Sequence, residues 1–398
     1  MSRPVAVIGA GVMGACVALV LAERGVHTVV FDREAAPLSG ASRWNEGKIH
    51  LGSLYSASGN LATARRILPG GLRFFKLMER LVDAPLEGHI TNGTDLYLVH
   101  RKSVAPPESI IAYNRAVGAL VEDHPDRDLY PGQPRAGDFR EVALSSLGIE
   151  VGPDILAAVE CPERSVATEP VADLLAQRLE DNPLVELRMS TQVSAVRETS
   201  RGMSIEAGSG NEDVFSHVVN AAWEGRPAID QASFGETDSR PNHRRRAALF
   251  FEAVDGIGLR SAVIAVGPFG DFKIYGDGRA YLSWYPAGLL GEGESVAPPT
   301  ISEPDSETKA AIAKAQLEGL SRLIPGLEQL RPQLDFARIE CGWVYSQGRG
   351  NLADPTASLH GRANFGVTRR GSYISVDTGK YSTAPDLAHD VADMICPA

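Results

Sequence analysis

Hydrophobic residues near the start of the chain form two short runs with a longer apolar stretch between them. Residues 4–8 and 27–31 are rich in β-branched side chains and predict buried strands, and the stretch between them predicts a helix. The first strand leads into Gly-Ala-Gly-Val-Met-Gly at 9–14, and the second strand is followed by Asp32. Strand, glycine-rich turn, helix and terminal acid together form the β-α-β pattern of a dinucleotide-binding unit.

Each glycine of this turn has its own expected task. Gly9 allows the tight turn, Gly11 lets the backbone approach a pyrophosphate, and Gly14 lets the helix pack closely on the strand. The free N–H groups at the helix start favour phosphate binding. Asp32 stands where a ribose hydroxyl needs an acceptor. The residues expected at the cofactor in this unit are Gly9, Gly11, Val12, Met13, Gly14, Asp32 and Arg33.

The remaining pattern of apolar positions predicts helices and strands that alternate between two kinds of sheet. Helices are expected at 61–82, 109–121, 167–179 and 308–323, and at the C-terminus. Strands are expected at 185–189, 192–198, 203–206, 215–220, 247–253, 261–266, 272–275, 280–284, 365–368 and 373–376. The segment 89–99 is predicted to be a hairpin that turns at Asn92-Gly93.

This order predicts an α/β protein in which a Rossmann-like nucleotide-binding domain is interleaved with an α+β domain built on an antiparallel sheet. A chain of 398 residues exceeds the size at which a single core keeps growing, so two domains are expected. The nucleotide-binding domain is predicted at 1–84, 165–230 and 340–398, and the substrate-binding domain at 85–164 and 231–339. An NAD dehydrogenase would complete its parallel strands before or after one catalytic domain, so the interleaving favours a flavin.

Composition narrows the class of protein further. With 43% hydrophobic residues, 22% charged residues and a net charge of −11, we expect a globular protein that binds neither nucleic acid nor an anionic membrane. Four widely spaced cysteines give no C-x-x-C pair, no metal-ligand spacing and no disulfide framework, which favours a reducing, cytoplasmic location. The apolar run 5–22 contains three glycines and lacks a basic segment before it, so we expect no signal peptide or membrane span.

Four further segments carry recognisable motifs. Residues 45–55 read NEGKIHLGSLY, residues 58–61 read SGNL, residues 218–222 read VVNAA and residues 379–384 read GKYSTA. Together with the β-α-β unit, they resemble the D-amino-acid-oxidase-like superfamily of FAD-dependent oxidoreductases. The segment 45–55 is similar to the N-S-G-V-I-H-A-G-x-Y-Y of L-2-hydroxyglutarate dehydrogenases, and 379–384 is similar to the G-G-K-x-T-T of glycerol-3-phosphate dehydrogenases.

The chain departs from the superfamily's pattern at two positions. Asp32 stands where the superfamily more often has glutamate, and Trp223 replaces the glycine that follows V-V-N-A-A. The resemblance implies non-covalent FAD, with the helix start after Gly379 stabilising negative charge on the reduced flavin. The further cofactor-binding residues that it implies are Ser42, Arg43, Asn45, Val193, Ala221, Ala222, Gly379, Lys380, Tyr381 and Ser382.

The same resemblance suggests catalytic residues. His50 is either a base that accepts a hydroxyl proton or a hydrogen-bonding partner of the flavin or backbone. A carboxylate-bearing substrate needs an anchor, and Arg362 stands where the glycerol-phosphate enzymes bind an anion, with Arg349 one loop earlier. Lys380 adds positive charge at the flavin or points to solvent. The expected catalytic residues are His50, Arg349, Arg362 and Lys380.

The inserted sheet gives weaker signals. Arg244-Arg245-Arg246 is interpreted as a surface feature leading into a strand. Cys341 is the candidate for a covalent flavin link, although a free buried thiol is the favoured interpretation. Lys273, Tyr275, Trp284 and Tyr285 lie on predicted strands, where they either cover the flavin or serve ordinary sheet packing.

The leading hypothesis is an FAD-dependent oxidoreductase that oxidises the C–H bond next to the amine of an amino acid or secondary amine by hydride transfer to the flavin. The alternatives are a 2-hydroxy-acid dehydrogenase, which the segment around His50 favours, a non-catalytic flavin- or nucleotide-binding protein, and an NAD-dependent dehydrogenase. The expected partners are a small-molecule substrate, which can carry a carboxylate, and O₂ or another electron acceptor.

Overall fold

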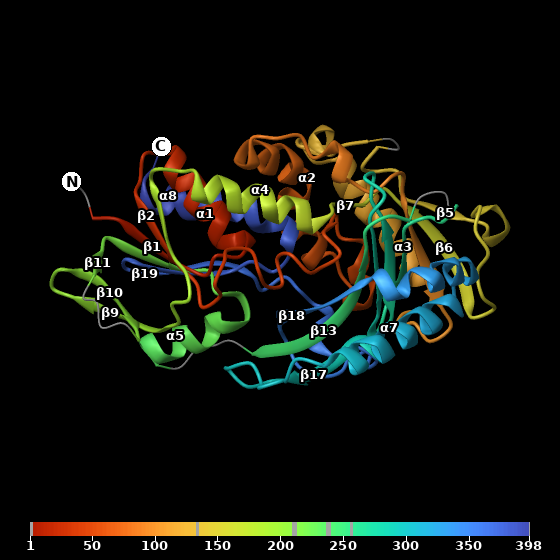
Figure 1. Cartoon of the computed structure of the whole chain (residues 1–398). Helices are drawn as coiled ribbons and strands as arrows, with labels where there is room; N and C mark the ends of the chain where they lie inside the picture. The colour runs from red at the N-terminus through yellow and green to blue at the C-terminus, as the bar shows by residue number, and fades with distance from the viewer. Residues whose placement is uncertain (1–2, 133–134, 209–212, 236–239, 255–257, 398) are drawn as a thin grey trace.

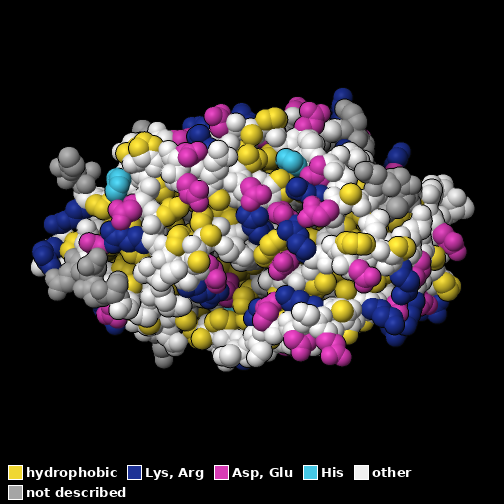
Figure 2. Space-filling view, in the orientation of Figure 1, with side chains coloured by type: hydrophobic (Ala, Val, Ile, Leu, Met, Phe, Trp, Pro, Cys, Tyr) yellow, Lys and Arg dark blue, Asp and Glu magenta, His cyan; other side chains and the backbone are white. Residues whose placement is uncertain are grey.

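A computed structural model describes residues 3–132, 135–208, 213–235, 240–254 and 258–397. A six-stranded sheet and a nine-stranded sheet occupy opposite ends of an elongated molecule, and helices lie against both (Figure 1). Acidic, basic and hydrophobic side chains are interspersed on the face shown in Figure 2. Among the described residues, no helix combines the length and the apolar character needed to cross a bilayer.

The six-stranded sheet contains the β-α-β unit predicted from the first residues. Its order is β19-β20-β12-β1-β2-β8, and every neighbouring pair is parallel except β19 with β20. The strands are β1 (Val5–Ile8), β2 (Thr28–Phe31), β8 (Val185–Arg188), β12 (His217–Asn220), β19 (Gly366–Arg370) and β20 (Tyr373–Asp377).

Alternating residues of these strands pack into two separate hydrophobic cores. Val7 and Val30 pack with apolar residues of four helices on one face of the sheet, whereas Ala6 and Ile8 pack with a small meander and one helix on the other. Figure 1 shows the four helices gathered on one side. They are α1 (Val12–Glu23), α2 (Ala62–Val82), α4 (Thr168–Glu180) and α8 (Ala384–Ile395); the meander is β9 (Val193–Thr199), β10 (Gly202–Ala207) and β11 (Val214–Phe215), with α5 (Arg226–Phe234).

The nine-stranded sheet has the order β17-β13-β16-β15-β14-β4-β6-β5, and β18 pairs with β13. All of its pairs are antiparallel except β14 with β4. Its strands are β4 (Asp95–His100), β5 (Arg140–Val142), β6 (Ile155–Cys161), β13 (Pro241–Phe251), β14 (Ala262–Ala265), β15 (Gly270–Ile274), β16 (Ala280–Trp284), β17 (Leu289–Gly293) and β18 (Arg338–Gln347).

Shorter elements connect the sheets. A two-stranded ribbon pairs β3 (Lys48–Ile49) with β7 (Arg164–Ser165), and it is followed along the chain from β3 by the 3₁₀ helix η1 (Ser53–Ser58). The other helices are α3 (Pro107–Glu122), α6 (Tyr285–Gly288) and α7 (Ser306–Ser321). The other 3₁₀ segments are η2 (Glu87–His89), η3 (Arg127–Leu129), η4 (Leu144–Ser146), η5 (Trp223–Gly225), η6 (Pro325–Phe336), η7 (Ser358–His360) and η8 (Tyr381–Thr383).

The fold class predicted from the sequence is confirmed, and one predicted element is wrong. No hairpin forms at 89–99: only its second half is a strand, β4, which pairs with β6 and β14. Its first half makes isolated bridges, from Ile90 to Val166 and from Thr91 to Tyr275, because the ribbon segment and β15 offer partners there. The domain boundary expected between 339 and 340 falls inside β18, which belongs to the nine-stranded sheet.

Candidate cofactor and substrate site

The glycine-rich turn after β1 is packed so tightly that side chains cannot replace Gly9 or Gly14. Gly9 has φ of +100°, and a Cβ added there would lie 2.7 Å from the carbonyl oxygen of Ala221. A Cβ on Gly14 would lie 1.8 Å from the carbonyl oxygen of Gly9. Gly11 is less constrained, since its Cβ would meet the Ser42 Oγ at 2.9 Å. The turn therefore joins β1, α1 and the segment after β12, which includes Ala222.

An acidic and a hydroxyl side chain accept hydrogen bonds from backbone N–H groups in and beside this turn. The Asp32 carboxylate accepts from the Ala10 N–H at 2.6 Å and from the Glu34 N–H at 2.9 Å. Ser42 Oγ accepts from the Val12 N–H at 2.8 Å, at the start of α1, where the first-turn N–H groups have no partner within the helix. Met13, in the same turn of α1, is buried. These contacts place Asp32 and Ser42 at the end of the helix where a pyrophosphate would bind.

The neighbouring cofactor candidates stabilise loops in this structure. Arg33 pairs with the buried Glu224 at 2.6 Å, and Arg43 pairs with Asp173 at 2.6 Å. The Asn45 side chain donates to the Ala41 carbonyl at 2.8 Å and accepts from the Gly47 N–H at 2.8 Å. Val193, the first residue of β9, is buried in the core beneath the sheet.

The C-terminal segment lies close to the other end of the site. Gly379 has φ of +67°, and an added Cβ would collide with the Phe365 ring at 2.4 Å. Lys380 Nζ lies 5.5 Å from the centroid of the Tyr55 ring. Burial, with the nearby charge of Arg362, lowers the pKa of Lys380 to about 7. The next residue, Tyr381, packs against the same core as α1, so both ends of the chain contribute to one region.

His50 is the buried histidine of this region. It is 2% exposed, its Nδ1 has no hydrogen-bond partner among the described residues, and its ring centroid lies 6.0 Å from that of Tyr55. Burial and the positive charges of Lys380 and Lys48 lower the pKa of His50 well below its usual value. His50 is therefore neutral at pH 7 and can accept a proton or a hydrogen bond.

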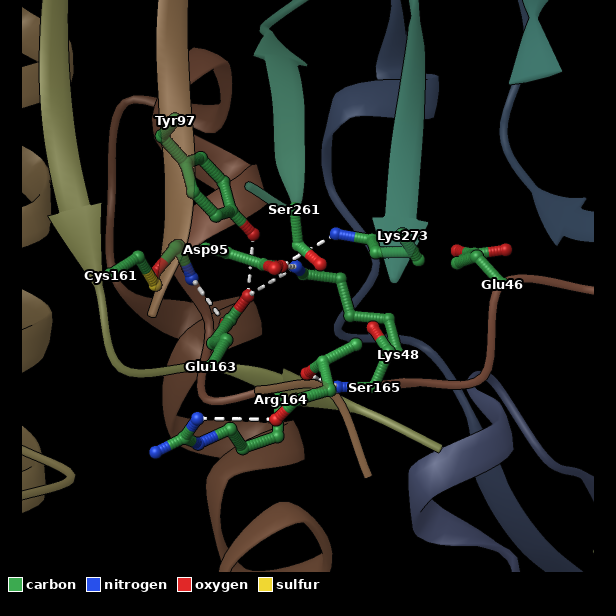
Figure 3. A network of polar contacts seen from close by, with 12 residues as sticks. Glu46, Lys48, Asp95, Tyr97, Cys161, Glu163, Arg164, Ser165, Ser261 and Lys273 are labelled. Carbon is green, nitrogen blue, oxygen red and sulfur yellow. Dashed lines mark hydrogen bonds and ion pairs between the residues drawn. The ribbon is translucent and has the colours of Figure 1, made fainter. Parts of the chain in front are cut away.

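A buried network of charges holds the segment that carries His50 (Figure 3). Lys48 forms an ion pair with Asp95 and lies 3.5 Å from Glu163 Oε2, and Lys273 Nζ lies 2.6 Å from Asp95 Oδ2. All four side chains are at most 2% exposed. Burial acts to raise the pKa of Asp95, but Lys273 and Lys48 outweigh it and hold the pKa below its usual value.

Glu163 fixes the backbone directly after His50. Its Oε1 accepts from the N–H groups of Leu51, Gly52 and Ser53 at 2.7, 2.9 and 3.2 Å, and its Oε2 accepts from Tyr97 Oη at 2.5 Å. The backbone is therefore held on both sides of His50. Lys48 pairs with Asp95 before it, and Glu163 accepts from the three N–H groups after it. Sequence analysis missed Glu163 and Asp95 because nothing in their local sequence indicates a distant partner.

The nine-stranded sheet has one apolar face and one polar face. Leu282 and Leu249 point to the apolar face, where they pack with Leu317 and Leu320 of α7. The strand register places the alternate residues on the opposite face, which we call the inner face. Its polar members are Asp95, Tyr97, Cys161, Arg244, Arg246, Asp271, Lys273, Tyr281 and Ser283, and Tyr275 follows Lys273 on the same side.

The arginine run on β13 is not the surface feature that the sequence suggested. Arg244 is 2% exposed and Nη2 donates to Ser346 Oγ at 3.1 Å. Arg246 lies with its guanidinium carbon 4.3 Å from the centroid of the Tyr285 ring, and Nη2 donates to Ser283 Oγ at 2.8 Å. Only Arg245 points to the opposite side, where it pairs with Glu303. Alternation along β13 places two of the three arginines on the inner face.

Two carboxylates lie near these arginines. Ser283 Oγ, which accepts from Arg246, donates to Asp271 Oδ1 at 2.8 Å. Burial and the nearby charge of Glu46 raise the pKa of Asp271 to about 6. Glu46 belongs to the loop before His50, and its carbonyl accepts from Tyr275 Oη at 3.1 Å.

The two predicted anchor arginines differ in position. Arg362 is half-buried: its N–H donates to Thr63 Oγ1 at 2.9 Å and its Nη1 donates to the Tyr345 carbonyl at 3.2 Å. Burial and the neighbouring Arg244 lower the pKa of Arg362 to about 10. Arg349, in contrast, is 65% exposed with Glu294 3.9 Å away, so the structure does not bring it to the other site residues.

Two cavities lie beside Arg362. A small cavity of about 20 Å³ is lined by Arg362, Ser346 and Gly379 among others. A larger cavity of about 380 Å³ lies between η1, the start of α2 and residues 355–364, and shares Gly361 and Asn364 with the small one. Polar, uncharged side chains such as Asn60 and Ser358 dominate its lining.

These residues fit a flavin dinucleotide. At one end stand the glycine turn, the free N–H groups of α1 and an acid after β2. At the other end, some buried polar atoms have no hydrogen-bond partner in the described part of the chain, as expected in a binding site for a polar group: His50 Nδ1, Tyr55 Oη, Tyr285 Oη and Ser382 Oγ. A nucleotide with a polar ring system at its far end would satisfy both ends.

Comparison with known proteins establishes the family to which this chain belongs. The family profile described as FAD dependent oxidoreductase, DAO, matches residues 4–351. The chain belongs to this family. Members of the DAO superfamily are FAD-dependent oxidoreductases, so this chain is an enzyme of that class, as the sequence motifs predicted. No curated protein sequence matches the chain significantly.

Solved structures of DAO enzymes share the fold over nearly their whole length. Glycine oxidase from Geobacillus kaustophilus is 17% identical with a TM-score of 0.68, over 99% of this chain and 94% of that chain. L-proline dehydrogenase from P. horikoshii is 15% identical with a TM-score of 0.65, over 99% and 93%. L-α-glycerophosphate oxidase from Mycoplasma pneumoniae, solved with FAD bound, is 13% identical with a TM-score of 0.64, over 99% and 95%. At these identities the likeness establishes the DAO fold.

One departure from the family motif is accommodated by the backbone. Trp223, at the position of the motif's glycine, has φ of +48°, a conformation that glycine adopts more easily. Its indole N–H donates to the Trp343 carbonyl at 3.0 Å, and its ring meets Tyr345 edge to face at 5.7 Å between centroids. These contacts with β18 offset the local cost of the backbone conformation.

Proposed function

We propose that this FAD-dependent oxidoreductase oxidises the C–H bond next to the nitrogen of a carboxylate-bearing amine. The observation that carries the proposal is the placement of cations and carboxylates around one site. Arg362 and Lys380 form no ion pair within 4.0 Å in the described part of the chain, while Glu46 lies near Lys380, and Asp271 lies near Glu46 and Arg246. An amino acid or a secondary amino acid carries the complementary charges.

Each group then has a defined task in substrate binding. Arg362 binds the substrate carboxylate through its remaining N–H donors, since a guanidinium matches a carboxylate in two-point contact. Asp271, whose pKa of about 6 leaves it mostly ionised at pH 7, accepts the proton that the substrate ammonium must lose before oxidation. The large cavity beside Arg362 provides the substrate's entry.

The cofactor is held at both ends by groups already described. We propose that Gly9, Gly11, Gly14 and Asp32 hold its pyrophosphate and adenosine ribose. Backbone N–H groups after Gly379 face its ring system, together with Lys380. FAD, when bound there, supplies the acceptor for the two electrons of the C–H bond.

We propose that the cofactor is bound without a covalent link. Burial, and the charge of Glu303, raise the pKa of the Cys341 thiol to about 11, so the thiol stays protonated and unreactive. All four cysteines are free thiols. Free thiols suit a reducing compartment, and a cytoplasmic location remains a prediction.

A second candidate is 2-hydroxy-acid oxidation, and His50 favours it. A neutral, buried imidazole with a free Nδ1 is the kind of base that alcohol oxidation needs. The non-catalytic alternative is set aside, because the family consists of oxidoreductases.

Anaerobic reduction of the purified protein separates the two candidates. The absorption spectrum should show flavin bands, and acid precipitation should release the flavin into the supernatant. Sarcosine, proline and glycine, or other carboxylate-bearing amines, should bleach the bands, whereas lactate and 2-hydroxyglutarate should not. Bleaching by the hydroxy acids alone would replace the amine proposal with the second candidate. Return of colour in air at a rate that matches turnover would support O₂ as the acceptor.

A further inference from the structure

Two arginines from distant parts of the chain converge on neighbouring residues of β18. Arg244 donates to Ser346 Oγ at 3.1 Å, and Arg362 donates to the carbonyl of the preceding Tyr345 at 3.2 Å. Arg244 is almost fully buried, and Arg362 lines the small cavity that Ser346 also lines. Among the described residues, neither guanidinium has a carboxylate within 4.0 Å. Arg244 is thus a buried cation and Arg362 a half-buried one, and neither has an ion-pair partner in the described part of the chain.

Most of the donors of these two side chains also have no hydrogen-bond partner among the described residues. A guanidinium has five N–H donors, so the pair has ten. Arg244 uses Nη2 on Ser346, and its buried Nε has no partner, while Arg362 uses Nη1 on Tyr345. One carboxylate has two oxygens with about four acceptor positions. Two guanidiniums therefore offer more donors than one carboxylate can accept.

The other charged groups near the pair already have partners. The Asp377 carboxylate lies 3.5 Å from Arg226, which also pairs with Asp230 at 2.9 Å, and it accepts from the Gln347 side chain. Asp271 reaches Arg246 through Ser283, and Glu46 lies near that arginine and Lys380. The Lys48, Asp95, Lys273 and Glu163 network contains two positive and two negative groups. Asp377, which shares Arg226 with Asp230, is the carboxylate of this set that lies near Arg362, and it forms no ion pair within 4.0 Å with either Arg244 or Arg362.

We propose that the substrate carries two carboxylate groups, one bound by Arg362 and the other by Arg244. The inference rests on the proposed function for the amine chemistry, but the binding of two carboxylates can be tested without turnover. A single carboxylate between both arginines would leave many of their N–H donors without an acceptor, which is costly in a site of low dielectric constant. The substrate class is thus an amine with two acidic groups, such as an N-carboxymethyl amino acid or an acidic amino acid.

Binding of simple acids to the flavin-containing protein tests the inference directly. Malonate, succinate and glutarate are compared with acetate, propionate and butyrate at equal ionic strength, by the shift that each causes in Tm. At least one dicarboxylate should bind about 10- to 100-fold more tightly than its monocarboxylate counterpart. Equal affinities of mono- and dicarboxylates would overturn the proposal and leave a two-arginine clamp for one carboxylate.

Variants on β13 identify the second anchor. Arg244→Gln should remove the preference for dicarboxylates and leave acetate binding within about threefold, and Arg244→Lys should keep part of the preference because it keeps the charge. Arg245→Gln is the matched control, since Arg245 points to the opposite side and pairs with Glu303. An unchanged preference in Arg244→Gln would overturn the assignment. If a variant does not fold, the comparison of acids on the unaltered enzyme still decides.

Turnover distinguishes failure of this inference from failure of the proposed function. Iminodiacetate and sarcosine differ by one carboxylate on the N-methyl carbon, so iminodiacetate should bleach the flavin with the higher kcat/KM. If sarcosine is the better substrate, amine oxidation is supported, but the binding of a second carboxylate by Arg244 is refuted. If dicarboxylates bind tightly while no amine reduces the flavin, the binding of two carboxylates is supported, but amine oxidation is refuted.

Discussion

The carbonyl oxygen of Gly9 lies where a Cβ on Gly14 would be, at 1.8 Å from that position. Backbone occupies this space, so no side-chain movement can relieve the contact. Gly14→Ala should therefore lower the free energy of unfolding by about 3 kcal/mol or more, because the whole β1–α1 junction must shift. Urea denaturation of the flavin-free protein measures this change.

Gly11→Ala provides the contrast to that prediction. Its Cβ would meet only the Ser42 Oγ, which can move, so the stability of the flavin-free protein should change by less than about 1 kcal/mol. FAD affinity should still fall at least tenfold, because Gly11 faces the expected pyrophosphate. Equal stability losses in the two variants would contradict the proposed division of tasks between the glycines.

Anion binding should depend on pH through Lys380. Its lowered pKa of about 7 means that the side chain carries a positive charge below pH 7 and loses it above, with Arg362, Arg244, Glu46 and Glu163 as its charged neighbours. Affinity for acetate should accordingly fall as pH rises from 6 to 8, as measured by titration of the flavin spectrum.

Substitutions separate Lys380 from the other titrating group nearby. Lys380→Arg keeps its charge over this range and should flatten the profile, while Lys380→Met should lower affinity at pH 6. Asp271 titrates near pH 6 and also disfavours anions once ionised, so Asp271→Asn serves as the control. A profile that stays steep in Lys380→Arg would show that another group is responsible.

Glu163→Gln should destabilise the protein by about 3 kcal/mol, because it removes a buried charge next to Lys48 and presents an amide donor to the network. Glu294→Gln, which alters an exposed carboxylate 3.9 Å from Arg349, should change stability by less than about 0.5 kcal/mol. Thermal unfolding of both variants compares them. Similar losses would mean that the buried network contributes no more than an ordinary surface pair.

His50→Asn distinguishes its two proposed roles. If the substrate is an amine whose proton goes to Asp271, the rate of anaerobic flavin reduction should fall by less than about tenfold. If His50 is the base for a hydroxy acid, the rate should fall by about 10²- to 10⁴-fold. Stopped-flow absorbance at saturating substrate gives the rate, and the flavin spectrum of the variant reports any loss of contact with the ring.

Local patterns in the sequence were sufficient for the nucleotide-binding half and insufficient for the inner face. The β-α-β unit is contiguous, so the tasks of Gly9 and Gly14 follow from spacing alone. Alternation on β15 also indicates that Asp271 and Lys273 share a face opposite Phe272. Alternation does not indicate whether the polar face meets water or another part of the protein, so the sequence alone does not reveal that Arg244 and Arg246 face the interior.

Contacts between residues far apart in the chain are the other feature that the sequence does not predict. Glu163 contacts residues more than 100 positions earlier, and Asp95 contacts Lys273 178 positions later. Neither contact leaves a trace in local spacing. The predicted hairpin at 89–99 is wrong for the same reason. The segment after Asn92-Gly93 pairs with strands far along the chain instead of folding back on residues 89–91.

The network around His50 has a consequence for how the enzyme denatures. Asp95 and Lys273 belong to the nine-stranded sheet, while Lys48 belongs to β3 of the two-stranded ribbon. One continuous hydrophobic core contains residues of both large sheets. Neither half can open without exposing charges and apolar surface of the other. The two sheets should therefore melt in a single transition, and fragments cut at the apparent domain boundary should not fold alone.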